Sequence, residues 1–327
     1  ILGKELPEVD AFVGRISLNH ASTRFPLTPR HLVYLKICEG CINNCSFCAI
    51  PKIKGKFSSL GIEVVLRQVD AFDREGVSEI NVIGQDITGY GMDLVGSPKL
   101  TQALKRIVKR IGHVGGLRLL YLYPSRVSSD LLRLMRDEPK ICKYLDLPIQ
   151  HINDRILKLM RRSTKKKDIL KLIDKARKMV PGVALRTSVI VGFPTETKIE
   201  FKELIRFLED SRFDRLGAFI YSREEGTYAY QFKGQIPEKV KSERFDEIML
   251  CQQRISREGN ERFMGQTLDI LIDEKTKDCF LGRTAYDAPE VDGVVYVKSA
   301  RELKPGEFVK VKITDTLEYD LSGVALP

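Results

Sequence analysis

Three cysteines that lie close together have the clearest chemistry in this sequence: Cys41, Cys45 and Cys48. Their spacing is C-x3-C-x2-C, and Phe47 stands just before the last of them. Thiolates are soft ligands that select iron–sulfur centres, zinc or copper(I). A 4Fe–4S cluster held by three cysteines keeps one iron without a protein ligand, and that iron can bind a cofactor or a substrate directly. The spacing therefore favours a 4Fe–4S cluster with an open iron.

A zinc knuckle is the main alternative, because Cys38 adds a C-x2-C pair and gives four cysteines within eleven residues. Zinc modules usually separate two such pairs by a longer spacer, whereas only residues 42–44 lie between these. A disulfide knot is disfavoured because nothing in the sequence indicates export. We therefore interpret Cys38 as a small buried residue of the preceding strand and not as a ligand.

The composition describes a globular protein with a basic body and an acidic end. The 327 residues are enough for one domain of about 250 residues and a small second one. Residues 260–327 contain 9 Lys or Arg against 13 Asp or Glu, although the whole chain carries a net charge of +10. A basic body suits an anionic or nucleic-acid-rich neighbourhood, with solvated surface charge as the alternative. An acidic end suits a basic protein partner.

Cysteine usage and hydropathy predict the compartment. No apolar run approaches the ~18 residues that cross a bilayer, so we expect no membrane span. Seven cysteines, with three or four of them in one metal-like cluster, indicate a reducing, cytoplasmic location. The sequence starts without Met or a signal pattern, so we expect it to be part of a longer natural protein.

Strand-length apolar runs alternate with amphipathic helical patterns over most of the chain. The predicted strands are 32–38, 79–84, 117–123, 144–149, 185–191 and 216–221. The predicted helices are 61–75, 99–111, 129–137, 154–161 with 167–180, 196–211 and 238–263. Six such units predict a parallel α/β sheet with right-handed crossovers, and they are too few to close an eight-stranded barrel. We therefore expect a partial (β/α)6 barrel, with its site at the carboxyl ends of the strands.

Short alternating strands follow Gly265, at 267–272, 280–283, 293–298, 308–315 and 319–324, and predict a small all-β barrel. The predicted organisation is a linker or extension at 1–30, the partial barrel at 31–262 and the β-barrel at 263–327.

Several longer motifs resemble those of the radical S-adenosylmethionine (radical SAM) methylthiotransferases. They are the cysteine motif, Gly84–Gly91, Leu147–His151, Asp154–Arg162 and Ile190–Glu196. The C-terminal barrel resembles a TRAM domain. Within it, Gly282-Arg-Thr and Asp287–Gly293 resemble the RimO branch, which modifies an aspartate on the twelfth protein of the small ribosomal subunit. The tRNA-modifying branches differ at Gln85-Asp86 and at Asp287–Gly293.

The resemblance implies a transferase of sulfur-containing groups with two cofactors, the 4Fe–4S cluster and SAM. The reduced cluster would cleave SAM to a radical that takes hydrogen from the aspartate β-carbon, and a methylthio group would replace it. A reducing electron donor is therefore expected as a partner. The family also has an N-terminal domain with a second 4Fe–4S cluster, which we expect to precede this sequence. Cys142, Cys251 and Cys279 are too scattered for that role and are interpreted as buried small residues.

The resemblance also assigns residues to SAM. Gly84, Gln85 and Asp86 end the second strand, where the superfamily receives the amino group of SAM; glycine admits close approach and the polar pair offers acceptors. A plain strand-end turn is the structural alternative. Arg186 would pair with the SAM carboxylate, although a structural ion pair explains it equally well. Adenine would contact Phe47, Gly192 and Phe193, each of which has a structural alternative.

Four further residues are expected at the substrate mouth. Gln150 and His151 end the fourth strand, and Tyr221 and Arg223 end the sixth. His151 could equally be a structural histidine, and the other three could be ordinary strand-end residues. No catalytic side chain is expected beyond the cluster and SAM.

The leading hypothesis is a methylthiotransferase whose acidic C-terminal barrel docks a basic small-subunit ribosomal protein, in the proximity of ribosomal RNA. A tRNA adenosine methylthiotransferase is the first alternative; its barrel should be basic, because phosphate contacts dominate RNA affinity. A zinc-stabilised RNA-binding protein without catalysis is the second alternative, and it leaves the six βα units without a role.

Overall fold

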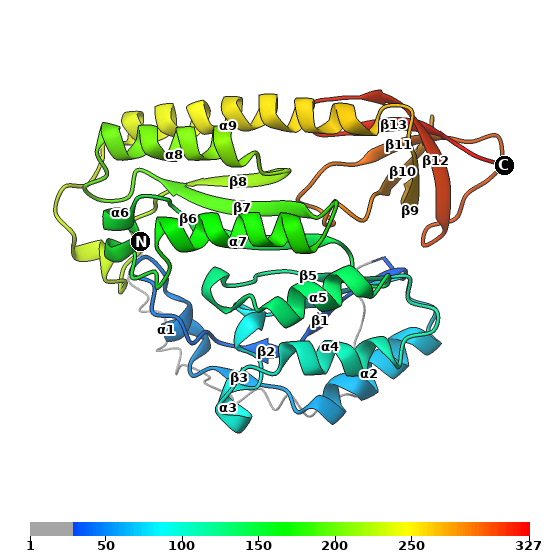
Figure 1. Cartoon of the computed structure of the whole chain (residues 1–327), viewed down its shortest axis with the longest axis horizontal. Coiled ribbons are helices and arrows are strands. Elements are labelled where there is room, and N and C mark those ends of the chain that lie inside the picture. The colour runs from blue at the N-terminus through cyan, green and yellow to red at the C-terminus, as the bar shows by residue number, and fades with distance from the viewer. Residues whose placement is uncertain (1–28) are drawn as a thin grey trace, which may run out of the picture.

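The computed structural model describes residues 29–327, in which an α/β body is followed by a small closed β-barrel (Figure 1). The linker predicted at 1–30 lies outside the described residues up to residue 28. The parallel strands of the body are β1 (Leu32–Lys36), β4 (Glu79–Ile83), β5 (Gly116–Leu119), β6 (Tyr144–Gln150), β7 (Ala184–Val191) and β8 (Arg215–Ile220). A short antiparallel pair, β2 (Cys38–Glu39) and β3 (Ser58–Ser59), lies beside the carboxyl end of β1.

Helices lie between the strands in the sequence, and the longer ones cover the outer face of the sheets (Figure 1). They are α1 (Ile50–Lys54), α2 (Ile62–Arg74), α3 (Met92–Val95), α4 (Leu100–Val108), α5 (Ser129–Asp137), α6 (Asp154–Leu159), α7 (Lys166–Met179), α8 (Lys198–Ser211) and α9 (Glu238–Asn260). The predicted βα order is therefore confirmed, with small shifts at the ends of elements.

Local sequence explains where these helices start and which side they bury. Helix α5 begins at Ser128, whose side chain accepts a hydrogen bond from Leu131 N, and α8 begins with a reciprocal capping box between Thr197 and Glu200. Helix α2 buries Val65 and Val69 on one stripe against the sheet, as an amphipathic helix should. The main apolar core lies between these helices and the strands.

The strands do not form the single parallel sheet that the pattern predicted. They form two three-stranded parallel sheets, β1-β4-β5 and β6-β7-β8. Strand β5 stops at Leu119, earlier than predicted, because Tyr121 adopts a left-handed conformation with φ of 62°. The Tyr121 N–H then donates to the Asp146 carboxylate at 2.9 Å and leaves the ladder, and Leu122 N donates to Asp146 O at 3.1 Å across the seam. A side chain thus replaces a ladder bond where the two sheets meet.

The C-terminal unit is a closed five-stranded barrel in the order β10-β11-β13-β12-β9. Its strands are β9 (Thr267–Lys275), β10 (Phe280–Arg283), β11 (Val295–Lys298), β12 (Phe308–Thr316) and β13 (Leu321–Ala325). Alternate residues such as Ile270, Ile272, Val295 and Val297 fill its interior. The barrel predicted from the sequence is therefore present.

The segment between β10 and β11, residues 284–293, is called the floor segment below. In Figure 1 the orange chain of this region reaches from the barrel toward β7 and β8. Tyr286 and Ala288 pack in a small apolar cluster with Tyr144 and Leu120 of the body. The floor segment therefore covers the inner face of the body strands near their amino ends.

Buried ion pairs join the two domains around the floor segment. Arg283 donates to Glu79 at 2.9 Å and to Asp273 at 2.6 Å, and its side chain is 4% exposed. Arg118 donates to the same Glu79 at 2.8 Å, and these contacts hold the pKa of that carboxyl below its usual value although burial acts in the opposite direction. Buried charges are tolerated only when they are paired in this way.

Among residues 29–327, none of the helices combines the length and apolar character that crossing a bilayer requires.

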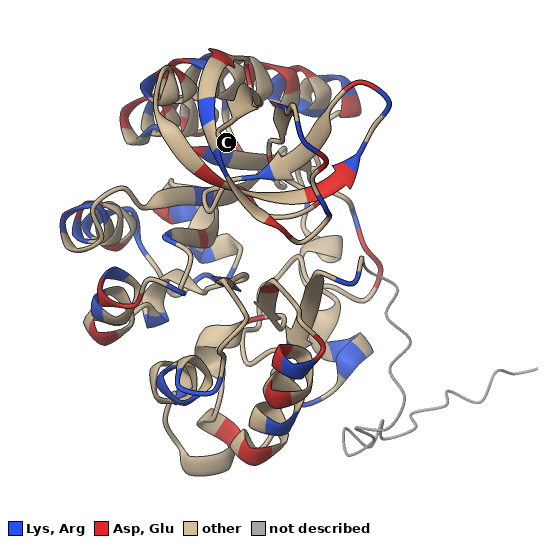
Figure 2. Ribbon diagram, turned by 90° about the vertical axis from the view of Figure 1, so that its right-hand side faces the viewer, with Lys and Arg blue, Asp and Glu red and all other residues tan. Residues whose placement is uncertain are grey.

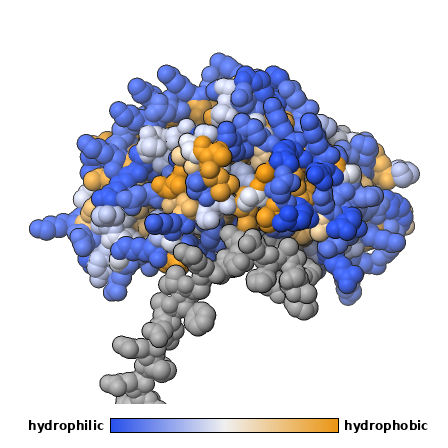
Figure 3. Space-filling view, turned by 90° about the horizontal axis from the view of Figure 1, so that it is seen from below, coloured by the Kyte–Doolittle hydropathy of each residue, from blue (hydrophilic) through white to orange (hydrophobic). Residues whose placement is uncertain are grey.

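The face seen from below Figure 1, on which α3 lies, carries a gathering of apolar side chains (Figure 3). Leu94 and Val95 of α3 are 52% and 60% exposed.

Substitution of Arg283 by Met should destabilise the junction between the domains, because it leaves the buried Glu79 carboxylate and the partly buried Asp273 carboxylate with reduced compensation. We expect the free energy of unfolding to fall by ~3–5 kcal/mol in urea titrations. Arg301→Met, which removes an exposed pair with Glu307 in the same barrel, should leave the urea midpoint unchanged. Equal midpoints for the two variants would show that the buried network does not stabilise the junction.

Candidate functional site

The loop that carries the three cysteines is fixed in place by backbone geometry and by hydrogen bonds to distant elements. Gly40 has φ of 72°, and a Cβ there would lie 2.9 Å from the Lys56 carbonyl oxygen, so only glycine fits. Ser46 donates through Oγ to Leu159 O at 2.7 Å, and its backbone N donates to Met160 O at 3.0 Å. Ala229 N donates to Ser46 O at 2.8 Å. The loop is thereby held against the end of α6 and the segment after β8.

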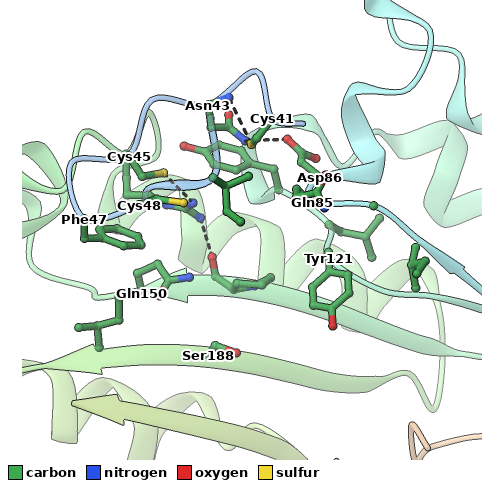
Figure 4. A pocket seen from close by; sticks show the side chains of 18 of the residues that line it. Cys41, Asn43, Cys45, Phe47, Cys48, Gln85, Asp86, Tyr121, Gln150 and Ser188 are labelled. Atoms are coloured by element: carbon green, nitrogen blue, oxygen red, sulfur yellow. Dashed lines mark hydrogen bonds between the residues drawn. The ribbon is translucent and has the colours of Figure 1, made fainter. Parts of the chain in front are cut away.

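A cavity of about 530 Å³ lies under this loop, at the carboxyl ends of the body strands (Figure 4). Its wall includes all three cysteines, together with side chains from both three-stranded sheets. They are Lys36, Cys41, Asn43, Cys45, Phe47, Cys48, Ile83, Gly84, Gln85, Asp86, Tyr121, Tyr123, Gln150, Arg162, Ser188, Ile190 and Phe219, with Ile50, Leu122 and Pro148. The carboxyl ends of the strands, where the sequence predicted the site, therefore hold a cavity.

The sulfur atoms receive hydrogen bonds from residues of the cavity wall. Cys41 Sγ accepts from the backbone N and from Nδ2 of Asn43, both at 3.4 Å, and Cys45 Sγ accepts from Arg162 Nη1 at 3.7 Å. All of the described cysteines are free thiols. Burial raises the pKa of Cys41 and of Cys48. In residues 29–327, no three Cys, His, Asp or Glu side chains are already gathered around a single-ion position.

Cys38 differs from these three cysteines. It is 1% exposed and is not part of the cavity wall, and its Sγ lies 3.8 Å from Asp86 O. Burial raises the pKa of its thiol to about 12. A Cβ at position 84 would lie 2.5 Å from Cys38 Sγ, so Gly84 is needed for this packing. The interpretation of Cys38 as a packed small residue agrees with this geometry.

Gln85 and Asp86 line the cavity but differ in what they can still bind. The Asp86 carboxylate accepts from Thr88 N at 3.0 Å, from Asn43 Nδ2 at 2.7 Å and from Arg126. Gln85 Oε1 is buried and accepts no hydrogen bond from the part of the chain that the structure describes. Asp86 therefore organises the wall, whereas Gln85 presents a free acceptor to the cavity.

Arg162 lines the cavity and was missed by the sequence reasoning, although it ends the Asp154–Arg162 motif. Its guanidinium stacks 4.1 Å from the centre of the Tyr123 ring, and Arg126 lies 4.4 Å from the same ring. Nη2 donates to Pro148 O at 2.5 Å and Nη1 to Cys45, while Nε is buried without an acceptor among the described residues. Arg161 has φ of 56° and turns the chain at the end of α6, a conformation that the sequence alone did not reveal.

Arg186 lies outside the cavity wall. It donates to Asp146 at 3.1 Å and to Asp292 of the C-terminal barrel at 3.3 Å, and its side chain is 14% exposed. Two carboxylates therefore already occupy the guanidinium. The sequence left two alternatives for Arg186, a contact with SAM or a structural ion pair. In the structure this residue forms structural ion pairs.

Gly192 and Phe193 support the cavity wall from behind and do not line it. Both backbone N–H groups donate to Glu196, that of Phe193 at 3.1 Å. The Phe193 ring is fully buried, lies 5.3 Å from the Tyr221 ring and belongs to the apolar cluster on which Phe47 packs. Neither residue belongs to the described cavity wall, and Phe193 packs in the cluster that supports Phe47.

Of the four residues expected at the substrate mouth, only Gln150 reaches this cavity. His151 is fully buried; its Nδ1 accepts from Asn153 N at 3.0 Å, and its Nε2 lies 3.8 Å from the Glu196 carboxylate. Tyr221 and Arg223 line a separate cavity of about 470 Å³ after β8. His151 is thus placed as a structural histidine.

The cavity is open on one side, because β8 is an edge strand among residues 29–327. Phe219 of β8 is 55% exposed and Tyr121 is 47% exposed, and both belong to the cavity wall. Exposed aromatic side chains beside a cavity are suited to contact with a large substrate.

Comparison with known proteins identifies the family. A model of the Radical SAM superfamily matches residues 35–208, and a model of the TRAM domain matches residues 264–326. The ribosomal protein uS12 methylthiotransferase RimO of Clostridioides difficile is 43% identical over 99% of this chain and 79% of its own length. The proteins of the same name from Thermodesulfovibrio yellowstonii and Aquifex aeolicus are 45% and 44% identical, over 99% and 98% of this chain and 79% and 78% of theirs. This chain belongs to the RimO family of radical SAM methylthiotransferases.

Membership of the RimO family confirms the resemblance seen in the motifs, and it makes the chain a radical SAM enzyme of the class that transfers sulfur-containing groups. The chain spans about four-fifths of the length of these relatives. Two solved structures share the fold. Coproporphyrinogen III oxidase (HemN) of Escherichia coli aligns over 80% of this chain and 68% of its own with a TM-score of 0.50 and 18% identity. The methyltransferase TsrM of Kitasatospora setae aligns over 73% and 39% with the same TM-score and 15% identity.

Single substitutions of Cys41, Cys45 and Cys48 by Ser should each remove most of the iron that the protein takes up. After anaerobic reconstitution, we expect about four irons per chain in the parent protein and well under one in each variant. Cys38→Ala is the matched control and should keep the full iron content, because Cys38 lies outside the cavity. Iron loss in the Cys38 variant, or zinc in place of iron in the parent, would contradict the assignment.

Proposed function

We propose that Cys41, Cys45 and Cys48 hold a 4Fe–4S cluster, that SAM binds beside it in the cavity, and that the enzyme adds a methylthio group to an aspartate of ribosomal protein uS12. One observation supports this most strongly. The cavity brings three free thiols together with one unpaired acceptor, Gln85 Oε1, and one unpaired donor, Arg162 Nε. A ligand with one ammonium and one carboxylate group would satisfy both atoms.

In this proposal Gln85 accepts from the amino group of SAM and Arg162 donates to its carboxylate. Arg162 takes the role first expected of Arg186, because its guanidinium still has a free buried N–H and lies beside Cys45. The Tyr123 ring and the Pro148 carbonyl fix the plane of this guanidinium. Phe47 and Ile190 supply an apolar wall for the adenine.

The cluster, when bound, supplies the electron that cleaves SAM. The residues of the chain do the remaining work of orientation and exclusion of water. Asn43 and Arg162 donate to the cysteine sulfurs, and such donors orient metal ligands and tune the reduction potential of a cluster. Asp86 holds Asn43 in this position at 2.7 Å.

The uS12 substrate would approach from the open side, past Phe219 and Tyr121, with Gln150 and Ser188 facing the target side chain (Figure 4). In this proposal the open side of the cavity takes over part of the docking of the ribosomal protein, which the sequence had assigned to the acidic C-terminal barrel. Asp287 and Asp292 of that barrel are paired with Arg215 and Arg186 of the body, and Asp273 is paired with Arg283 of the barrel itself, so their charges are not available to a partner. Residues of both signs occur on the barrel (Figure 2).

One further partner and one further cofactor follow from the family alone. We propose that a reducing protein supplies the electron and that the second cluster of the family is held by residues other than those described. Cys142, Cys251 and Cys279 lie in separate places, in the body core, on α9 and in the turn between β9 and β10. The cytoplasm is the proposed compartment, because thiols and clusters of this type need reducing conditions.

Arg162→Gln should weaken the binding of SAM by about 10- to 100-fold, which is the usual effect of losing a charge-assisted hydrogen bond. Calorimetry on the reconstituted protein would measure it, with iron content determined in parallel. The matched control is Arg161→Gln, whose parent side chain is exposed and stacks on Tyr228 at 3.5 Å. Unchanged affinity in the Arg162 variant would remove this residue from the SAM site.

The choice of substrate is tested by reconstituting the protein anaerobically, reducing it in the presence of SAM, and adding either uS12 or tRNA. We expect 5′-deoxyadenosine in both reactions. With sulfide and a second-cluster domain of the family added to supply the sulfur, we expect a mass gain of one CH2S unit on a uS12 aspartate only, since SCH3 replaces H. Methylthiolated adenosine with unmodified uS12 would reverse the choice of substrate. SAM cleavage with neither product would limit the function of these residues to radical generation.

A further inference from the structure

The floor segment contains the Asp287–Gly293 motif that the sequence linked to the RimO branch and to the choice of a protein substrate. In the structure, the two aspartates of this motif point into the body. The side chains of Asp287 and Asp292 are each 3% exposed, and both accept from arginines of the body strands. The motif therefore serves the junction between the domains, and its two aspartates reach different parts of the body.

Asp292 is bound from three sides. Its Oδ2 accepts from Tyr144 Oη at 2.5 Å and from Ala288 N at 2.9 Å, and its Oδ1 accepts from Arg186 Nε at 3.3 Å. Tyr144 and Arg186 belong to β6 and β7, neighbouring strands of the second sheet, of which β6 borders the seam with the first. A residue of the C-terminal domain thus fixes the inner side of both strands.

Arg186 connects Asp292 with the wall of the cavity. Its Nη1 donates to Asp146 Oδ1 at 3.1 Å and to Ser188 Oγ at 3.4 Å, and Ser188 lines the cavity. The other oxygen of Asp146 accepts from Tyr121 N at 2.9 Å. Tyr121 also lines the cavity, and its left-handed conformation persists only because surrounding contacts enforce it.

We propose that Asp292 is a positioning residue for the cofactor cavity, which acts through Arg186 and Asp146 on the backbone of Tyr121 and the hydroxyl of Ser188. Without Asp292, the Arg186 guanidinium loses one of its two anionic partners and no longer has a fixed orientation. Asp146 would then have to follow Arg186 or release the Tyr121 N–H. The C-terminal barrel is accordingly part of the catalytic unit, although it supplies no residue to the cavity wall among those described.

Asp287 provides a matched control within the same segment. Its carboxylate accepts from Arg215 at 2.6 Å and from Thr284 Oγ1 at 2.6 Å. Arg215 in turn contacts Asp214 O and Asn260, and none of these residues lines the cavity. The two aspartates thus have similar burial and similar partners, but only Asp292 is connected to the cavity.

The test compares Asp292→Asn, Asp287→Asn and the parent protein without cofactors, by hydrogen–deuterium exchange of peptides that cover residues 119–124. We expect exchange at the Tyr121 amide to become at least tenfold faster in Asp292→Asn and to stay within twofold of the parent in Asp287→Asn. Equal exchange in all three proteins, or equal acceleration in both variants, would overturn the proposal. If Asp292→Asn does not fold, Arg186→Lys takes its place with the same expected result, because lysine cannot bridge two carboxylates as a guanidinium does; unchanged exchange in that variant would equally overturn it.

A second readout, SAM affinity after reconstitution, rests on the proposed function. Asp292→Asn should bind SAM at least fivefold more weakly than the parent, and Asp287→Asn within twofold of it. A parent protein that binds no SAM would refute the proposed function, while the exchange experiment would still decide the role of Asp292. Normal SAM affinity in Asp292→Asn would count against positioning of the cavity.

Discussion

A parallel barrel of six strands does not close, and this constraint shapes the rest of the molecule. In β4, Ile80 and Val82 face the helices and belong to the main core, while Glu79 and Ile83 face inward. In a closed barrel that inner face would be filled by side chains of opposite strands. Here charged residues occupy it, and burial of charges is costly unless each has a partner. The C-terminal barrel provides those partners through Arg283, Asp287 and Asp292.

The two ends of the same strands therefore have different tasks. At the amino ends, the floor segment and its ion pairs cover the inner face and join the domains. At the carboxyl ends, the cysteine loop covers the cavity and keeps polar groups in it without partners. The left-handed residue Tyr121 stands between these regions, because its N–H bonds to Asp146 below it and its side chain lines the cavity above. Rigidity at one end thus supports binding at the other.

Charge illustrates how a count along the sequence differs from a surface in space. The surplus of acidic residues in 260–327 predicted an acidic docking surface for a basic protein. Two of those acids, Asp292 and Asp287, are matched to Arg186 and Arg215 of the basic body. Part of the charge difference between the body and the C-terminal domain is therefore neutralised at the junction between them. Only the remaining acidic residues are available to a partner.

The sequence by itself determined the order of elements, the three-cysteine motif and the family, and it predicted a site at the strand ends. These follow from hydrophobic periodicity and from local motifs, which are properties of neighbouring residues. Only the tertiary structure decided which polar residues meet in the cavity. Arg162 lies in the cavity wall. Arg186 instead pairs with Asp146 and Asp292, and His151 is buried beside Glu196. The physical reason is that the role of an arginine or histidine depends on which charges lie within a few ångströms of it. Those charges come from elements that are distant in the sequence, such as the floor segment, and only folding brings them together.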